Sequence, residues 1–366
     1  MRPLRKIAFL LEEFQIHSPS QQLLDRFLIG YPRDGKFHQL AGVEVAAYLP
    51  PNNREANLER RANEFHLVLK PSADAALADA DAVVIVPRGG GPLADDTLLR
   101  TALERAPEGA ACFVHGVLAS SLEIARRQIQ LAASRKISLL AGTPLAVTWR
   151  LPEIDLPLGT RLSEALIVVQ GPALAAELNG LEGLLPLIER RKSGEAGVRR
   201  VRFLEGRNLW RAGDKKLWSW PLLAAAISRS DSPHGDPVKD GRTQDLVGLG
   251  LVPKLATEPC GWLLEHRDGL RSAILVLDGV VADFNFAVRA RDGSIFSAQL
   301  FRPPPPGEHH FSRLAAVLED FFQTGKPPWP VQRNLLIAGL LETFGRPATR
   351  FAERVETPEL AIAYNR

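Results

Sequence analysis

The chain has 366 residues, of which 45% are hydrophobic and 24% charged, and its formal net charge is +3 at pH 7. That length exceeds one ordinary hydrophobic core and predicts two domains of a soluble globular protein. Basic residues are spread along the chain apart from short clusters such as Arg190-Arg191-Lys192, which are typical of solvated faces and argue against nucleic acid as a partner.

The cysteines and the apolar runs indicate the expected environment. Cys112 and Cys260 lie far apart in apolar contexts, as expected for buried thiols in a reducing compartment. The apolar run near the N-terminus is too short for a signal peptide, and no run approaches the roughly 18 residues of a membrane helix. We therefore expect a cytoplasmic protein with no membrane partner.

The first part of the chain alternates strands with helices. It begins with a buried strand at Lys6–Leu11, a polar turn, and an amphipathic helix that starts at Ser18-Pro19-Ser20. Further strands are predicted at 43–49, 66–69, 81–87, 110–114 and 137–141, with helices between them at 53–64, 72–80, a segment ending at 105, and 118–135. This alternation predicts an α/β fold with a Rossmann-like, doubly wound parallel sheet, whose loops bind ligands along one edge.

After residue 145 the pattern changes. Strands are predicted at 162–170, 199–204, 269–277, 280–289 and 294–301, and helices at 173–191, 219–229, 310–323 and 331–342. The turns Asp278-Gly279 and Asp292-Gly293 predict hairpins, and residues 230–242 have the composition of a loop. We therefore predict a Rossmann-like domain over 1–145, an α+β domain over 146–345 and a C-terminal tail over 346–366. The α+β domain should have an open, mostly antiparallel sheet with helices on one face.

The turn after the first strand carries polar residues at the predicted binding edge. Glu12, Glu13 and His17 lie there, with no glycine. A pyrophosphate needs glycines in this turn, so that backbone approaches it closely and a helix N-terminus faces it. The two carboxylates and the histidine could serve acid/base chemistry, although adjacent side chains of an extended segment point to opposite sides.

Two other loops at the same edge carry candidate residues. Arg88 with Gly89 and Gly90 could present amides and a guanidinium group to an anion, or form a flexible loop. His115 ends the fifth strand and is the best single candidate for proton transfer near pH 7, with a buried, satisfied histidine as the alternative. Neither His309-His310 nor His234 with Asp236 has a carboxylate cluster at ligand spacing, so no metal site is predicted.

Several segments, together with the order of the two domains, carry a family resemblance. They are Leu139–Arg150, Leu156–Gly159, Glu189–Arg191, Gly194–Gly197, Phe203–Gly206, His266–Arg271, Pro303–Pro306, Thr324–Pro328 and Glu356–Pro358. The chain resembles the Gfo/Idh/MocA family (glucose–fructose oxidoreductase, inositol dehydrogenase and MocA), and more closely a divergent bacterial branch of it. The resemblance implies an oxidoreductase that uses NAD(P) and acts on a sugar, cyclitol or related polyol.

Three local features of that family are missing here. The glycine-rich turn corresponds to Glu12–His17, without glycine, and the Glu-Lys-Pro motif corresponds to Val114-His115-Gly116, without lysine. The Gly-x-His-x-x-Asp motif corresponds to Leu178–Glu182, where Asn179 stands at the histidine and Glu182 at the aspartate. Asn179 and Glu182 lie at i and i+3 on one helix, so both could face the family's substrate cleft.

The resemblance also implies a substrate site and a partner. Trp149 and Arg150 lie near the family's cleft, where a Trp packs on sugar rings and an Arg holds a carboxylate or phosphate. The second-domain sheet of this family is usually covered by a partner, so we expect a homo-oligomer. Three functions stay open: a polyol oxidoreductase that binds NAD(P) in an unusual way, with His115 or Glu182 moving the proton; a catalytically degenerate ligand-binding or regulatory protein; and a redox-neutral lyase or isomerase.

Overall fold

The computed structural model describes residues 4–51, 56–90, 96–232 and 245–365. It divides into two compact units, which we call unit 1 (Met1–Val147 and Pro303–Ala338) and unit 2 (Thr148–Arg302 and Gly339–Arg366). The sequence predicted residues 303–338 in the second domain, whereas the structure places them in unit 1. The reason is helix α10 (His310–Thr324), whose apolar face joins the core of unit 1 and places Phe322 5.7 Å from the ring of Phe27.

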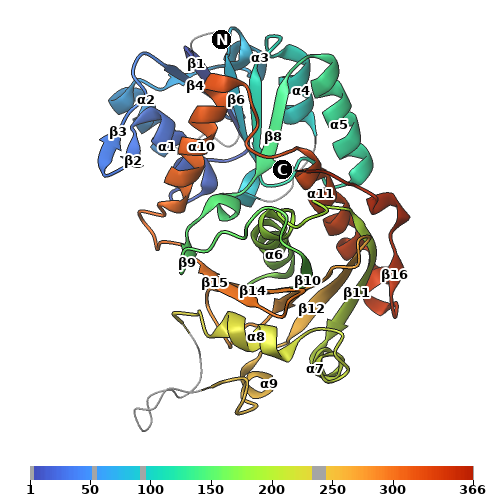
Figure 1. The fold of residues 1–366 in the computed structure, drawn as a ribbon. Helices are drawn as coiled ribbons and strands as arrows, with labels where there is room; N and C mark the ends of the chain where they lie inside the picture. The colour runs from blue at the N-terminus through green and yellow to red at the C-terminus, as the bar shows by residue number, and fades with distance from the viewer. Residues whose placement is uncertain (1–3, 52–55, 91–95, 233–244, 366) are drawn as a thin grey trace. The chain divides into compact units, whose positions relative to one another are not determined.

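Unit 1 contains a parallel six-stranded sheet, which confirms the predicted Rossmann-like fold (Figure 1). Its strands, in sheet order, are β5 (Val68–Leu69), β4 (Glu44–Tyr48), β1 (Lys6–Leu11), β6 (Ala82–Val86), β7 (Ala111–His115) and β8 (Ser138–Gly142). The chain runs outward from β1 through β4 to β5, then returns to β6 on the other side of β1. The order therefore reverses between β1 and β6, and ligands of such sheets bind beyond the carboxyl ends of the strands at this switch point.

Helices cover both faces of this sheet. α1 (Pro19–Leu28), α2 (Ala56–Phe65) and α10 pack on one face, while α3 (Ala73–Leu77), α4 (Thr97–Arg105) and α5 (Leu122–Ser134) contact one another on the other. Ser18, Ser72 and Ser121 cap α1, α3 and α5, each accepting a hydrogen bond from a first-turn amide. The apolar run of β6 is buried at every residue, because both faces of the strand are covered.

A short hairpin was not predicted. β2 (Tyr31–Arg33) and β3 (Lys36–His38) pair antiparallel between α1 and β4. The hairpin is fastened to α10 through Glu319, which accepts a hydrogen bond from the Tyr31 hydroxyl at 2.7 Å and lies 2.8 Å from Nε2 of His38. The Asp34-Gly35 turn, with both residues at positive φ, was the signal available in the sequence.

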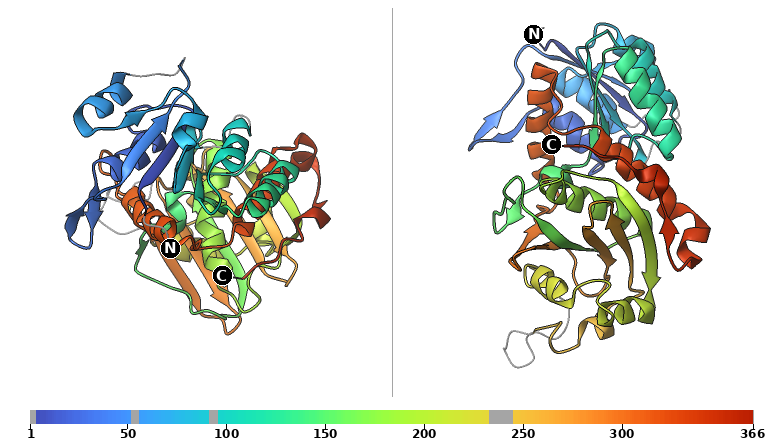
Figure 2. Two further views of the ribbon diagram at one scale, coloured as in Figure 1. Left: turned by 90° about the horizontal axis from the view of Figure 1, so that it is seen from above. Right: turned by 45° about the vertical axis from the view of Figure 1, so that its right-hand side comes forward.

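Unit 2 contains a mixed, mostly antiparallel eight-stranded sheet, as predicted (Figures 1 and 2). Its strands, in sheet order, are β16 (Val355–Glu356), β11 (Val198–Glu205), β12 (Cys260–His266), β13 (Arg271–Val276), β10 (Leu162–Val169), β14 (Phe284–Ala290), β15 (Ile295–Leu300) and β9 (Arg150–Leu151). The hairpin predicted at Asp292-Gly293 is confirmed by the pairing of β14 with β15. The hairpin predicted at Asp278-Gly279 is wrong, because β10 lies between β13 and β14 and pairs with both.

Helices lie on both faces of this sheet, not on one face as predicted. α6 (Ala173–Ile188) packs on one face, where Gly180 faces Ile274 of β13. α7 (Gly206–Asp214), α8 (Trp220–Ile227) and α9 (Val252–Leu255) contribute to a core on the other face, which includes Ala273 and Leu275. The homo-oligomer was predicted because one face of this sheet was expected to be open. The chain covers that face with its own helices, so self-association stays a prediction without that support.

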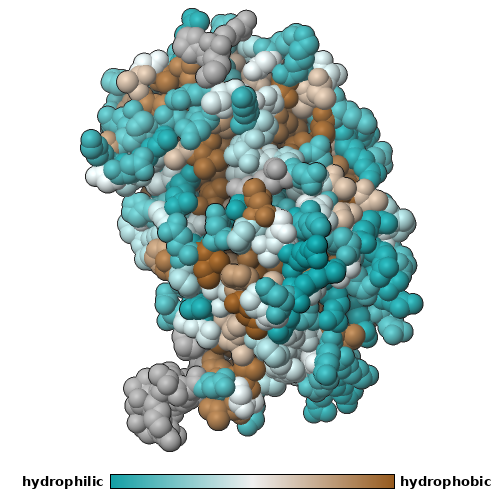
Figure 3. Space-filling view, in the orientation of Figure 1, coloured by the Kyte–Doolittle hydropathy of each residue, from teal (hydrophilic) through white to brown (hydrophobic). Residues whose placement is uncertain are grey.

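The outer surface over α7 is polar. α7 turns Leu209 and Ala212 inward and leaves Arg207 and Arg211 exposed, and hydrophilic residues dominate that part of unit 2 in Figure 3. α11 (Gln332–Gly345) passes from unit 1 to unit 2, and α12 (Pro347–Phe351) follows it.

Candidate functional site

The switch point of unit 1 is closed by two carboxylates of the chain itself. Glu12 and Glu13 follow β1 directly, and Arg88 and Gly89 follow β6 within a single 3₁₀ turn (Arg88–Gly90). The carboxylate of Glu12 accepts a hydrogen bond from the amide of Arg88 at 2.9 Å, and that of Glu13 accepts one from the amide of Gly89 at 2.8 Å. The loops that follow β1 and β6 are therefore bonded to each other.

The backbone amides at the start of α1 also find hydrogen-bond partners within the chain. Ser18 Oγ accepts hydrogen bonds from the amides of Gln15 and Gln21, and the Ser18 carbonyl accepts one from Gln22. The amide of His17 donates to the side-chain oxygen of Gln21 at 2.6 Å, and Pro19, the first residue of the helix, has no amide hydrogen to offer. Most donors that would face an anion at this helix N-terminus thus already have partners.

The turn between β1 and α1 is filled by a side chain. Phe14 is fully buried in the core of unit 1, with the Arg61 guanidinium carbon 5.5 Å from its ring centre. Arg61 in turn forms a two-pronged ion pair with Asp25 of α1, at 2.9 and 3.1 Å. This packing holds the turn in a conformation that needs no glycine, because only His17 among its residues has a positive φ.

These residues do not fit a dinucleotide in its usual position. A pyrophosphate needs unpaired backbone amides at this edge and no anion beside them. Here the amides of Arg88 and Gly89 are bonded to Glu12 and Glu13, whose carboxylates would repel the phosphates. The sequence predicted Glu12, Arg88, Gly89 and Gly90 as a cofactor-binding group at one edge. The structure places them on the two loops of that edge, with the amides of Arg88 and Gly89 bonded to the two glutamates.

His115 lies at the carboxyl end of β7, inside unit 1. It is 4% exposed, its ring stacks on Phe311 of α10 at 5.9 Å, and neither ring nitrogen has a hydrogen-bond partner among the described residues. Burial lowers the pKa of His115 to about 4, so the ring is neutral at pH 7. A general acid or base must reach its substrate, and in this conformation Phe311 covers the ring.

The candidates of unit 2 fall into two groups. Trp149 and Arg150 are half-buried at the start of the unit, and Arg150 forms an ion pair with Asp155. Asn179 and Glu182 share one face of α6, where Asn179 is half-buried and Glu182 is buried. The predicted spacing on one helix is therefore present.

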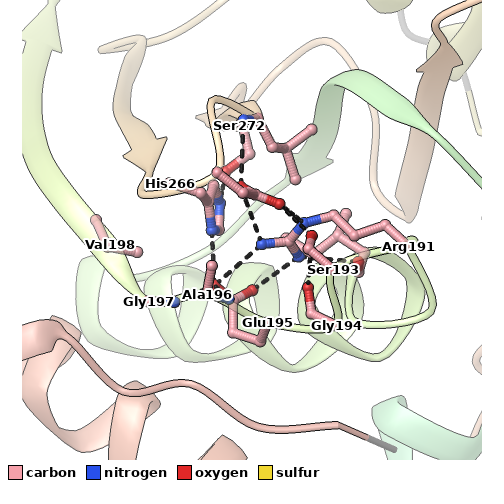
Figure 4. Close-up of polar contacts among 12 residues, drawn as sticks. Arg191, Ser193, Gly194, Glu195, Ala196, Gly197, Val198, His266 and Ser272 are labelled. Atoms are coloured by element: carbon pink, nitrogen blue, oxygen red, sulfur yellow. Dashed lines mark hydrogen bonds and ion pairs between the residues drawn. The ribbon is translucent and has the colours of Figure 1, made fainter.

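Unit 2 also contains a buried charged network, which we call the Glu195 network (Figure 4). Arg191, with a side chain 2% exposed, donates to Glu195 at 3.0 and 3.2 Å and to Asp268 at 2.7 Å. His266 Nδ1 lies 3.0 Å from Oε1 of the same Glu195 carboxylate, and His266 Nε2 lies 2.9 Å from Ser272 Oγ. The sequence predicted Arg190-Arg191-Lys192 as a solvated face, which is wrong for Arg191 because two carboxylates hold it in the interior.

The network fastens neighbouring backbone. The amides of Ala196 and Gly197 donate to Glu195 Oε1 at 3.0 and 2.9 Å. The backbone of Glu195 exchanges two hydrogen bonds of 2.9 Å with Tyr364 near the C-terminus. Burial alone would raise the pKa of Glu195, but the charges and hydrogen bonds of His266 and Arg191 lower it to about 2. The carboxylate is therefore ionised and held by its partners.

The hydrogen-bond distances from Ser272 to His266 and from His266 to Glu195 are those of a nucleophile, its base and an orienting acid. Ser272 is 4% exposed on a central strand, however, and His266 is 1% exposed. No substrate carbonyl could approach Ser272 Oγ in this conformation, so we interpret the group as structural. The signal in the sequence was the presence of Gly194–Gly197 and His266–Gly269 among the segments of the family resemblance, although their meeting was not predicted.

Two searches of the described residues concern metal ligands and membrane-spanning helices. Within the ranges that the structure covers, no group of three or more His, Cys, Asp and Glu side chains could hold a metal ion. His309 and His310 lie at the start of α10, while His234 and Asp236 lie outside the described residues. Each helix that the structure describes is too short or too polar to span a bilayer.

Solved structures share the fold. A myo-inositol 2-dehydrogenase from Lactobacillus plantarum is 11% identical, with 97% of this chain and 99% of that one covered at a TM-score of 0.57. A myo-inositol dehydrogenase from Lactobacillus casei, solved with NAD(H) and myo-inositol, is 13% identical over 96% of both chains at 0.56. GenD2 of gentamicin A biosynthesis, solved with NAD, is 14% identical over 96% of both chains at 0.56.

These structures confirm the predicted two-domain fold, which the chain shares with the two inositol dehydrogenases and with GenD2. No protein-family model matches the sequence, and a search of curated proteins by sequence finds no match. The identities of 11–14% to the solved structures are too low to carry more than the fold.

Proposed function

We propose that this protein binds a sugar, cyclitol or related polyol on a dehydrogenase fold and does not carry out nicotinamide-dependent hydride transfer. The observation that carries the proposal is the closed switch point, where Glu12 and Glu13 occupy the amides of Arg88 and Gly89. A dinucleotide would have to break both hydrogen bonds and then sit beside two carboxylates. Each loss costs on the order of 1–3 kcal/mol because a charged acceptor is involved.

The state of His115 supports the same conclusion. The ring is buried against Phe311 and neutral at pH 7, and His115 itself stands where the family resemblance places the lysine. A proton cannot pass between this histidine and a bound alcohol unless α10 moves away from β7. In this conformation His115 is therefore not an accessible acceptor for the proton that accompanies hydride transfer.

The ligand class rests on the fold comparison. The related structures include dehydrogenases of inositols, one of them with myo-inositol bound. Within unit 2 we propose Trp149, Arg150 and Asn179 as ligand contacts, since all three are half-buried, and Glu182 as a buried support on the same face of α6 as Asn179.

The second candidate is an oxidoreductase of the same polyols that holds NAD(P) in an unusual position, with Glu182 as the alternative proton acceptor. The observation that favours it is the coverage of nearly the whole chain by solved structures that were determined with NAD or NAD(H). Under this alternative the closed switch point would open when the cofactor binds.

Thermal denaturation with added ligands separates the two. We expect a panel of inositols and hexoses to include a stabilising ligand, while NAD⁺, NADH, NADP⁺ and NADPH at millimolar concentration leave the melting temperature unchanged. An Arg150→Ala variant should lose the polyol response. Arg190→Ala is the matched control, because Arg190 contacts the same Asp155 with an equally buried side chain. Absence of any polyol response would contradict a binding function.

A further inference from the structure

The two loops at the switch point have the geometry of an occupied anion site. β1 and β6 pair in parallel up to Leu11 and Val86, so their loops leave the sheet side by side, and the amide of Glu12 donates to the Val86 carbonyl at 3.2 Å. The consecutive amides of Arg88 and Gly89 then converge on the carboxylates that follow β1. Gly89 has φ +61°, and consecutive amides that end in such a left-handed residue form an anion-binding nest.

A cation completes this nest. The Arg88 side chain is 64% exposed, and its Nε lies 3.9 Å from Glu13 Oε2. Two amides and a guanidinium group therefore face the carboxylates of Glu12 and Glu13. This donor set is the one that proteins use for phosphate oxygens. Among the described residues, no atom lies within 4 Å of a Cβ added at Gly89.

We propose that Glu12 and Glu13 act as built-in substitutes for a diphosphate at this nest, and that removal of their carboxylates uncovers a site for inorganic pyrophosphate or a diphosphate ester. The inference rests on the proposed function, because it names the residues that keep a dinucleotide out. It also assigns them a positive role: the carboxylates join the β1 and β6 loops in the chain without ligand, as a bound dinucleotide does in a working dehydrogenase.

The test is the double variant Glu12→Ala/Glu13→Ala in the full chain, followed by thermal denaturation. Without ligand, the variant should melt at least about 4 °C below the parent, as expected for loss of two hydrogen bonds to charged acceptors in a unit of this size. Millimolar pyrophosphate should recover most of that loss and leave the parent unchanged. NAD⁺ in a parallel series shows whether a diphosphate ester is accepted as well as the inorganic ion.

Two further variants keep the result interpretable. Glu12→Gln/Glu13→Gln retains an acceptor oxygen at each position and removes only the charge, so it should fold even where the alanine variant does not, and it should also gain a response to pyrophosphate. Glu104→Ala removes an exposed glutamate from α4, on the same unit but away from the nest, and should gain none. Sulfate at equal ionic strength controls for general salt effects.

The inference is overturned if pyrophosphate stabilises neither double variant more than it stabilises Glu104→Ala, or if it stabilises the parent equally. A different result would contradict the proposed function, namely an increase in the melting temperature of the parent with NAD(H) or NADP(H). A parent without a cofactor response, together with double variants that gain no pyrophosphate response, would leave the proposed function in place and remove the substitute role of Glu12 and Glu13.

Discussion

Replacing Glu195 by glutamine should strongly destabilise unit 2. The carboxylate accepts hydrogen bonds from Arg191, from His266 and from two backbone amides, all in the interior. Glutamine keeps the shape, removes the charge and turns an NH₂ group toward one of these donors. The buried guanidinium of Arg191 would then keep only Asp268 as an acidic partner.

The pKa of Glu195 gives the magnitude. A fall from 4.5 to about 2 corresponds to about 3 kcal/mol of stability at neutral pH. Removal of one partner of a buried ion pair typically costs about 3–5 kcal/mol, which agrees. Since the folded pKa of this carboxyl group is lowered, its contribution is complete above pH 4.5 and is lost as the pH falls toward 2. The difference between parent and variant should shrink in the same window.

Urea denaturation followed by tryptophan fluorescence measures this effect, because every tryptophan except Trp329 lies in unit 2. Glu265→Gln is the matched control: its carboxylate pairs with Arg199 and Arg200 at the surface, and exposed pairs contribute about 0–1 kcal/mol. If Glu195→Gln costs less than about 1 kcal/mol, or costs the same at pH 7 as near pH 2, the Glu195 network does not carry the stability assigned to it.

Two further predictions concern packing and buried charge. His115→Leu should leave stability at pH 8 unchanged or higher and should flatten its pH dependence. With the folded pKa lowered from 6.5 to about 4, the unfolded chain protonates first, so parent stability falls as pH drops through that range; equal slopes for parent and variant in calorimetric pH series would refute this. Gly197→Ala should destabilise more than Gly269→Ala, although both have positive φ. A Cβ at Gly197 would lie 2.7 Å from Ile362 N, whereas one at Gly269 meets nothing within 4 Å. Equal melting temperatures for the two glycine variants would contradict the close approach.

The parallel sheet was predictable because its signals are local. The predicted strand Lys6–Leu11, with its apolar run from Ile7 to Leu11, has the same bounds as β1, and the β-branched run of β6 predicts a strand covered on both faces. The order of the unit 2 strands was not predictable in the same way. The Asp278-Gly279 turn has a hairpin composition, but β10, more than one hundred residues earlier, enters between the two strands that it joins. Turn residues specify a local bend and carry no information on distant pairing.

The candidate site was likewise predictable only where its signals are local in sequence. Parallel strands end at one edge, so the sequence brought Glu12, Arg88 and His115 to that edge. Whether each polar group is available depends on contacts that are distant in sequence. Glu12 meets the Arg88 amide, and Phe311 covers His115 from a helix almost two hundred residues later. The same reason explains why Arg191 was predicted as exposed, since its partner Asp268 is far along the chain.

The central claim is that the switch point excludes a dinucleotide. Its most direct test is the melting temperature of the unmodified chain with NADH and NADPH, read beside a calorimetric titration of the same cofactors. We predict no heat of binding and no stabilisation at millimolar cofactor. A stabilisation approaching about 2.7 kcal/mol, the value for a ligand at 100 times its dissociation constant, would contradict the account.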